Sequence, residues 1–171
     1  LESYPSVVIT QDILVPRLGG KDQNKHLAID AAMKIKKVVK EENLDDAIKV
    51  KVTESGIAIK VADPIGFDPG DADVKPELIA TLHGISKIIN RTPGTKIRVE
   101  GHTDNTPIHT TKYPSNWELS ASRALNVVKF LAETGGIDPS TLSAVGYGEF
   151  RPLVPNSTKE NRQVNRRIEI Y

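Results

Sequence analysis

The sequence predicts a two-layer α/β sandwich: a mixed sheet with helices mainly on one face, plus an N-terminal helical arm. Segments with apolar residues at every second position, typical of strands, alternate along the chain with segments that repeat every three to four residues, typical of helices. Strands that alternate with helices favour one sheet covered by helices. A length of 171 residues suffices for one sizeable core.

The composition excludes several classes of function. Hydrophobic and charged residues make up 38% and 26% of the chain, which is ordinary for a globular protein. The net charge of +1 gives no electrostatic basis for nucleic-acid binding. Because the sequence has no cysteine, it has no disulfide and no thiolate site for a metal or for catalysis. It also has no apolar run of about 18 residues, the length that predicts a transmembrane helix.

The chain is predicted to have three parts. Residues 1–20 form a linker or plug-like lead-in that ends in a glycine pair, residues 21–45 hold an N-terminal helix, and residues 46–171 form one domain. The lysines of the helix are interpreted as a solvated face, with contact to a lipid or polymer as the alternative. The expected buried stripe is Leu27, Ala31, Ile35 and Val38, opposite Lys34, Lys36, Lys37 and Lys40.

Periodicity and turn residues predict the elements of the domain. Pro76 marks the first turn of one helix, and Ser115 with Glu118 forms a capping box that opens another. A second capping box, Ser157 with Glu160, is expected to open a short helix. The expected order is a hairpin at 48–52 and 57–61, a helix from 76 to about 92, a strand at 96–101, a helix at 116–134, a strand at 142–147, a short helix after 157 and a strand at 167–171.

The most informative stretch runs from Arg98 to Arg123. A short strand leads into Gly101-His102-Thr103-Asp104, a loop of turn formers follows, and the capped helix carries Arg123 about two turns in. A carboxylate at a strand end and a guanidinium on the next helix can meet at one rim of the domain. Such a pair suits a small zwitterion that carries an ammonium and a carboxylate. A structural ion pair across the strand–helix junction is the alternative.

Three separated motifs in this order, GHTDN, LSASRA and NRQVNRRIEI, resemble those of the OmpA-like peptidoglycan-binding domain. The resemblance spans roughly residues 57 to 171, and the longer loop with the phrase YPSNWELS resembles the flagellar motor stator B subunits (MotB type) of that superfamily. It implies an OmpA-like fold and a non-catalytic anchor. Such an anchor fixes an ion-driven membrane channel to the cell wall, on the periplasmic side, so that the motor can generate torque for motility.

The same resemblance implies a set of site residues. In it Asp104 holds the ammonium, and Arg123 the carboxylate, of a diaminopimelate-like residue in the peptidoglycan stem peptide. Arg166, or its neighbour Arg167, could instead neutralise acidic neighbours on the last strand. The other expected site residues are Thr103, Asn116, Leu119 through its backbone, and Ser120, with Arg162 and Arg166 matching the terminal arginines of the family.

The expected partners also follow from the resemblance. They are the stem peptide or glycan of peptidoglycan, a second copy in a homodimer, and a stator A-type membrane subunit bound through a region before Leu1. One transmembrane helix in that region is expected to anchor the full-length protein in the inner membrane. No cofactor is expected. The alternatives are an envelope tether of the OmpA or Pal type and a cell-wall hydrolase.

Other readings of single residues are weaker. Trp117 is predicted to pack in the core, with stacking on a sugar as the alternative. No metal site is predicted, because His102, Asp104 and His109 lack the spacing of known metal motifs.

Catalytic and calcium sites are not predicted either. His102, Asp104 and Ser120 are triad residue types, but no GxSxG elbow accompanies them. A glycosidase pair of Glu100 and Asp104 is disfavoured, because strand alternation points Glu100 away from the inward face. The aspartates at 68, 71 and 73 do not fit a calcium loop, since the position that requires glycine holds Pro76.

Overall fold

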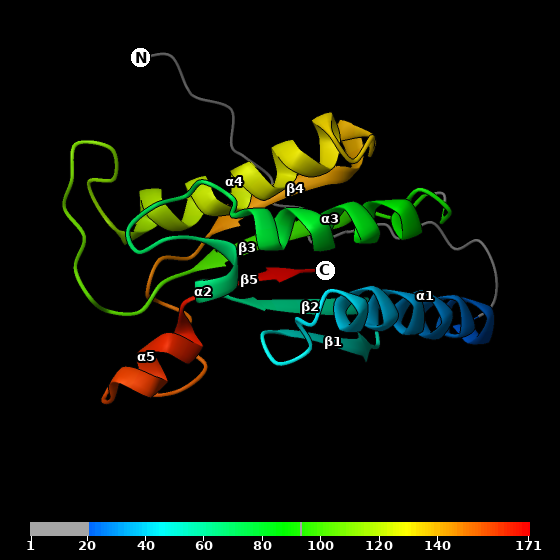
Figure 1. The fold of residues 1–171 in the computed structure, drawn as a ribbon, viewed down its shortest axis with the longest axis horizontal. Coiled ribbons are helices and arrows are strands. Elements are labelled where there is room, and N and C mark those ends of the chain that lie inside the picture. Colours follow the sequence, from blue (N-terminus) through cyan, green and yellow to red (C-terminus); the bar gives the residue numbers. More distant parts are fainter. Residues whose placement is uncertain (1–20, 93) are drawn as a thin grey trace, which may run out of the picture.

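A computed structural model describes residues 21–92 and 94–171, so the expected lead-in at 1–20 lies outside the described residues. It confirms the predicted α/β sandwich (Figure 1). The elements are α1 (Lys21–Glu41), β1 (Ile48–Thr53), β2 (Gly56–Ala62), α2 (Asp63–Gly66), α3 (Pro76–Ile89), β3 (Ile97–His102), α4 (Asn116–Glu133), the 3-10 helix η1 (Pro139–Thr141), β4 (Leu142–Gly146), α5 (Lys159–Asn165) and β5 (Arg167–Ile170).

The five strands form one mixed sheet in the order β1-β2-β5-β3-β4. The β1–β2 hairpin is antiparallel, as predicted, and β5 lies antiparallel between β2 and β3. The pairing of β3 with β4 is parallel, which requires the crossover that α4 supplies. The C-terminal strand therefore lies in the centre of the sheet, and Arg166, just before it, lies at the same end of the sheet as the residues that follow β2 and β3.

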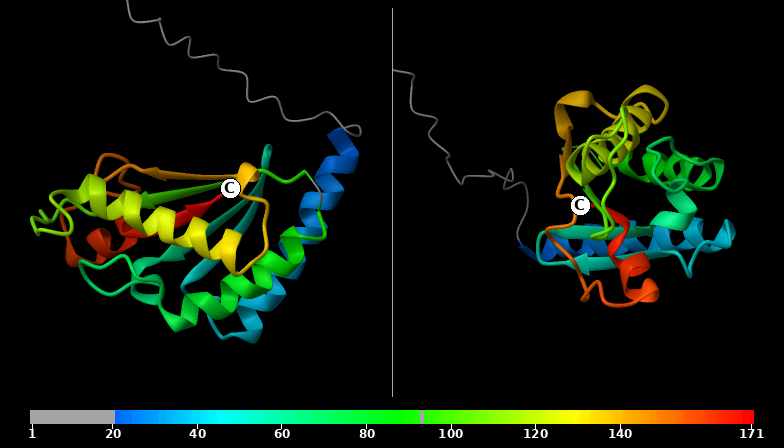
Figure 2. Two further views of the ribbon diagram at one scale, coloured as in Figure 1. Left: turned by 90° about the horizontal axis from the view of Figure 1, so that it is seen from above. Right: turned by 90° about the vertical axis from the view of Figure 1, so that its left-hand side faces the viewer.

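The long helices α1, α3 and α4 pack on one face of the sheet, and in the left view of Figure 2 α4 crosses in front of the strands. The core between the layers includes Leu82 of α3, Val127 of α4 and Val99 of β3, all fully buried. Ile35 and Val39 of α1 belong to the same core, so the N-terminal helix packs against the domain. None of the helices in residues 21–92 and 94–171 has both the length and the apolarity needed to cross a bilayer.

Two glycines let α4 approach the sheet closely. Gly101 of β3 and Gly146 of β4 are register partners. A Cβ atom at Gly101 would lie 2.0 Å from the carbonyl oxygen of Ser120, and one at Gly146 would lie 2.5 Å from the backbone nitrogen of Ala121. The N-terminal half of α4 thus rests on bare strand backbone, and this close approach positions Arg123.

The other face of the sheet is polar, and part of it is shielded from water. Alternation along β3 points Arg98, Glu100 and His102 away from the helices, as expected for a strand. Glu100 and His102 are nevertheless 4% and 2% exposed, respectively. The ring of Tyr147 stacks on His102 with a centroid distance of 5.3 Å, so the segment after β4 helps to cover this face.

Several details differ from the sequence prediction. In α1 the buried side chains are Ala31, Ala32, Ile35 and Val39, whereas Leu27 is 54% exposed, because the buried stripe continues through Ala32 and Val39 rather than Val38. The N-cap of α5 is Thr158, whose hydroxyl accepts a hydrogen bond from Asn161 N, so the box built on Ser157 was placed one residue early.

The prediction that Trp117 packs in the core is wrong. Its side chain is 47% exposed and stacks on Phe150, which is 63% exposed, with a centroid distance of 5.1 Å. The buried stripe of α4 instead includes Ala124, Val127 and Leu131. A helix positioned by glycines at its first turns lies with its backbone against the strands there, which leaves Trp117 on the outer side.

Candidate functional site: a charged cleft at one end of the sheet

A cleft of about 560 Å³ opens where β2, β3 and α5 end and α4 begins. In Figure 1 this is the end at which α2, the long β3–α4 loop and α5 lie. Its charged lining residues come from four separate segments and are Asp63, Asp68, Lys75, Asp104, Arg123 and Arg166. The remaining lining is mostly apolar or uncharged and includes Phe67, Ile108 and Leu119.

The β3–α4 loop forms one wall of the cleft because it is fastened to residues 68–75. Tyr113 is buried against Ala72 and Leu119, and Ile108 packs against the same small cluster. Lys112 Nζ donates to the Asp71 carboxylate at 2.9 Å. The loop therefore has its own apolar anchor, which holds an otherwise irregular segment in place.

Arg123 lies at the bottom of the cleft in a buried ion pair with Asp63. Its Nη1 is 2.5 Å from Asp63 Oδ1, and the two side chains are only 3% and 8% exposed. Arg123 also donates from Nε to the carbonyl of Asp71 at 2.7 Å and from Nη2 to the carbonyl of Asp68 at 3.1 Å. Burial raises the pKa of Asp63, and the charges of Arg123 and Arg166 oppose that rise.

Arg166 links this pair to Asp104. Its Nη1 donates to Asp104 Oδ2 at 2.5 Å, and its Nε lies 3.4 Å from Asp63 Oδ2. The other carboxylate oxygen of Asp104 accepts a hydrogen bond from the backbone nitrogen of Thr106 at 2.7 Å. The cleft thus contains an alternating row of charges, Arg123–Asp63–Arg166–Asp104. Arg166, with a side chain 32% exposed, is the most accessible group of the row.

The structure brings most of the predicted site residues to this cleft but pairs them differently. Thr103, Asp104, Asn116, Leu119, Arg123 and Arg166 all line it. Asp104 pairs with Arg166, not with Arg123 as the sequence suggested, because Arg123 points toward Asp63. Asn116 donates to the carbonyl of Thr106 at 3.0 Å and so joins α4 to the loop.

Ser120 and Arg162 are not among the residues that line the cleft. Ser120 is completely buried, and its hydroxyl accepts a hydrogen bond from the backbone nitrogen of Gly148 at 2.9 Å. Arg162 donates to the carbonyl of Asn156 at 3.1 Å, within the segment around α5. Both side chains stabilise the segments that lead to the cleft rather than forming its surface.

Sequence reasoning missed Asp63, the central anion of the row. It follows β2 directly, in an Asp-Pro pair that the sequence suggested only as part of a turn. β2 and β3 are not adjacent in the sheet, and only the position of β5 between them brings Asp63, Asp104 and Arg166 to one end. The sequence signal that could have identified Asp63 is a carboxylate immediately after a strand.

The catalytic and metal alternatives weighed from the sequence are not assembled here. His102 lies on the polar face of the sheet, Asp104 lies in the cleft, and the Ser120 hydroxyl bonds to Trp117 and Gly148, so no triad forms. His109 shares a hydrogen bond with the carbonyl of Pro114 at 3.0 Å, within the loop. Burial, together with the charge of Arg167, lowers the pKa of His102 to about 4.

The comparisons with known proteins agree with the fold and the placement of the motifs. Residues 66–166 match the OmpA family. Motility protein B of Bacillus subtilis (strain 168) is 38% identical over 136 residues, which are 80% of this chain and 52% of that protein. The chain spans about half the length of this protein and of other curated relatives that it matches.

Solved structures give the same result. A putative MotB-like protein from Desulfovibrio vulgaris superposes with a TM-score of 0.78 at 27% identity, over 88% of this chain and 93% of that one. The cell wall anchor of the T6SS from Pseudomonas aeruginosa superposes with a TM-score of 0.71 at 28% identity, over 81% and 96% of the two chains. The resemblance inferred from the three motifs is therefore confirmed, and the chain belongs to the OmpA family, with MotB proteins among its similar relatives.

Proposed function

We propose that this chain is a non-catalytic anchor that binds peptidoglycan through the cleft and, as part of a flagellar stator B subunit, fixes an ion-driven channel to the cell wall. The observation that carries the proposal is the row of alternating charges in the cleft, in which a half-buried cation, Arg166, lies against a buried anion, Asp104. A row of this kind offers both signs of charge to a ligand within a few ångströms.

The ligand class that fits is a zwitterion such as the diaminopimelate-like residue of a stem peptide. Its ammonium binds the carboxylate of Asp104, in the place that Arg166 Nη1 takes in the free protein. Its carboxylate binds a guanidinium of the row. Arg123 uses three of its nitrogens in the contacts with Asp63, Asp68 and Asp71, and a guanidinium has five N–H groups, which leaves two for a ligand.

Uncharged groups around the row supply the remaining contacts. Thr103 and Asn116 line the cleft beside Asp104, and Leu119 contributes an apolar wall. The charged groups are already desolvated, since Asp104 and Asp63 are 4% and 7% exposed. Charged hydrogen bonds formed at a site that is already dry cost less additional desolvation than those on an open surface.

The stator role rests on the relatives rather than on the cleft. Motility protein B of Bacillus subtilis is similar to this chain, and so is the MotB-like structure from Desulfovibrio vulgaris. In this proposal a preceding transmembrane helix anchors the protein in the inner membrane beside a stator A-type subunit, and the OmpA-family domain lies in the periplasm. An envelope tether of the OmpA or Pal type is the second candidate, because a probable lipoprotein of Escherichia coli is also 36% identical.

A homodimer is part of the proposal. Support comes from α1, where Ile29 and Met33, four residues apart on one side of the helix, are 36% and 59% exposed. Apolar side chains that recur along one exposed helix face gain from a second copy of that face. Analytical ultracentrifugation over a wide concentration range tests this, and a monomer at every concentration contradicts it.

Co-sedimentation with purified, insoluble peptidoglycan tests the binding function. The chain is expected to sediment with the polymer, to be released by free diaminopimelate, and to leave no soluble muropeptides behind. Asp104→Asn is expected to stay in the supernatant, whereas the matched control Asp73→Asn, at an exposed aspartate outside the cleft, sediments as the parent does. Release of muropeptides would instead establish a hydrolase.

The stator role needs a separate test in cells. In the full-length protein, Asp104→Asn is expected to abolish swimming while leaving membrane-inserted protein at its normal level. Normal swimming combined with outer-membrane blebbing would favour the tether.

A further inference from the structure

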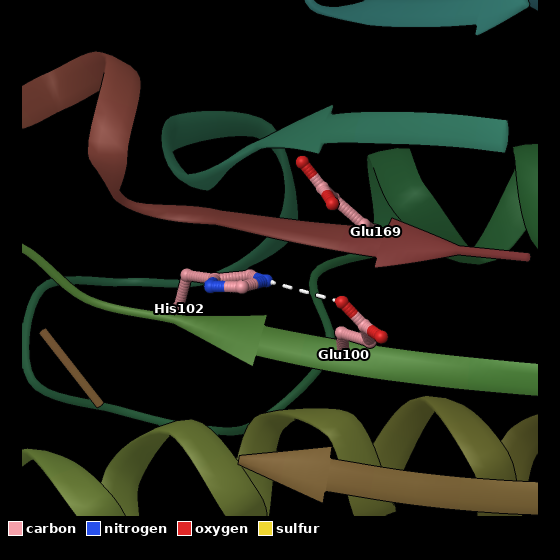
Figure 3. Close-up of side chains that lie close together, drawn as sticks. All are labelled: Glu100, His102 and Glu169. Carbon is pink, nitrogen blue, oxygen red and sulfur yellow. Dashed lines mark ion pairs between the residues drawn. The ribbon is translucent and has the colours of Figure 1, made fainter. Parts of the chain in front are cut away.

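The polar face of the sheet contains a second buried cluster, which the peptidoglycan proposal does not use. Glu100 and His102 of β3 point toward one another in Figure 3, and Glu169 of β5 lies close to them. Glu100 and Glu169 are directly opposed register partners across the two strands. Like charges in directly opposed positions are destabilising unless something of opposite charge lies between or beside them.

His102 is the unusual member of this cluster. It is 2% exposed, and among the described residues neither Nδ1 nor Nε2 has a hydrogen-bond partner. Its Nε2 points toward Glu100 Oε2 at 3.6 Å, beyond hydrogen-bonding distance. A buried polar group without a partner costs about 1–3 kcal/mol, so a fold that keeps one requires an explanation.

We propose that Glu100, His102 and Glu169 bind a divalent transition-metal ion of the zinc type. One ligand atom from each residue lies within 4.8 Å of the others. Two ligands that bind zinc at about 2.0–2.2 Å with tetrahedral geometry lie about 3.4 Å apart. The 3.6 Å between His102 Nε2 and Glu100 Oε2 is therefore close to a ligand–ligand distance, while Glu169 offers an oxygen within 4.8 Å of both and has to move closer to bind the same ion.

The ligand types indicate the class of ion. An imidazole nitrogen with two carboxylates favours zinc or a neighbouring first-row metal over magnesium or calcium, which prefer oxygen ligands alone. Three protein ligands leave a fourth position for water, on the side of Glu169, whose side chain is 14% exposed. The ion supplies the missing partner of His102 and binds two carboxylates, each of which has one arginine beside it in the free protein.

The groups around the proposed site act in two ways: some orient a metal ligand, and one cation competes with the ion for a ligand. Arg167 Nε donates to Glu169 Oε1 at 2.7 Å and the Tyr171 hydroxyl donates to Glu169 Oε2, which orients the carboxylate in the way that outer hydrogen bonds orient metal ligands. Arg98 Nε lies 2.7 Å from Glu100 Oε1 with a side chain 45% exposed. Arg98 is half-exposed, whereas the Arg167 side chain is only 3% exposed, so Arg98 can turn into solvent. We therefore expect Arg98 to compete with the ion for Glu100 and to be displaced when the ion binds.

The test uses the whole chain after treatment with a chelator, with zinc as the titrant in a calorimeter. The other three histidines, His26, His83 and His109, are exposed and could bind zinc weakly at the surface, so all three are changed to alanine in the background protein. This background is expected to bind one equivalent of zinc and to melt at a higher temperature with zinc than without it. His102→Ala in the same background is expected to lose at least about tenfold in affinity.

Arg98→Gln sharpens the test because it changes neither a core residue nor one of the three proposed ligand residues. Removal of the competing guanidinium is expected to tighten zinc binding several-fold, whereas loss of any ordinary stabilising residue would leave binding unchanged or weaken it. If His102→Ala fails to fold, the zinc affinity of Arg98→Gln still tests the proposal. The proposal is overturned if the background binds no zinc at about 1 mM, if His102→Ala keeps full affinity, or if Arg98→Gln does not increase it.

Discussion

Two polar clusters lie only two residues apart at the end of β3, and they differ in whether their own residues complete them. Asp104 lies in the cleft, where each buried charge of the row has an oppositely charged neighbour within 3.4 Å. His102 lies on the other face, where its ring nitrogens have no hydrogen-bond partner among the described residues. β3 ends at His102, and Asp104 already belongs to the loop that follows, so the alternation of the strand no longer fixes the side on which Asp104 lies.

The difference indicates what each region requires from outside. The cleft is electrostatically complete in the free protein, so a ligand must exchange with Arg166 and gains affinity by matching contacts that already exist. The polar face is incomplete, and something that supplies a partner to His102 stabilises the fold outright. A ligand of the cleft is therefore expected to change binding more than stability, and a metal on the polar face is expected to raise the melting temperature.

The largest expected effect on stability is at the bottom of the cleft. Arg123→Met removes one partner of a buried ion pair and leaves Asp63 charged without its nearest counter-ion. We expect a loss of about 3–5 kcal/mol in the free energy of unfolding, measured by urea denaturation. Arg91→Met, at an exposed arginine, is the control and is expected to change little.

A double variant makes this test specific. Addition of Asp63→Asn to Arg123→Met removes the uncompensated carboxylate, so the double variant is expected to be more stable than Arg123→Met alone. A loss below about 1 kcal/mol for Arg123→Met would contradict the electrostatic account of the cleft.

The next effect concerns Gly101, which lets α4 approach β3 closely. Gly101→Ala introduces a Cβ atom 2.0 Å from the backbone carbonyl oxygen of Ser120, and a backbone atom cannot move aside as a flexible side chain can. We expect a loss of about 1–3 kcal/mol in the free energy of unfolding as α4 is pushed from the sheet. The control is Ala58→Ser, on the hairpin; Gly94→Ser is unsuitable because the backbone at Gly94 has a positive φ of 79°. An equal loss of stability in Gly101→Ala and Ala58→Ser would contradict the close-packing explanation.

The smallest expected effect lies on the polar face. His102→Phe replaces an unpartnered ring with an apolar ring of similar shape, which removes the cost of burying two polar nitrogens. In metal-free protein we expect a change within about 1 kcal/mol of zero, or a gain in stability. Thermal melts in the presence of a chelator measure it. A loss as large as that of Arg123→Met would mean that His102 has a stabilising partner even without metal.

The sequence predicted the elements well because their signals are local. Alternation in residues 48–61, Pro76 at a helix start and Ser115 at a helix cap each act within a few residues, and the structure confirms all three. The helix stripes were less accurate, since tertiary packing decides which of several apolar residues turns inward. Trp117 shows this, because the glycines of other strands determine how α4 rests on the sheet.

The partners within the site could not be predicted for the same reason. Asp104 and Arg123 were recognised as site residues from motifs, but their ion-pair partners, Arg166 and Asp63, lie about 60 residues away in sequence. They meet only because β5 inserts between β2 and β3. Likewise Glu100 appeared to be a surface residue, although the pairing of β3 with β5 and the segment after β4 bury it.

The affinity of Asp104→Asn for a soluble, diaminopimelate-containing stem peptide tests the central claim most directly. The variant keeps the size of the side chain and an oxygen for the Thr106 nitrogen, but it loses the charge that binds an ammonium. Calorimetry is expected to show a loss of about 2–5 kcal/mol in binding free energy, more than tenfold in affinity, in protein that still melts cooperatively. Unchanged affinity in the folded variant would contradict the assignment of the cleft as the peptidoglycan site.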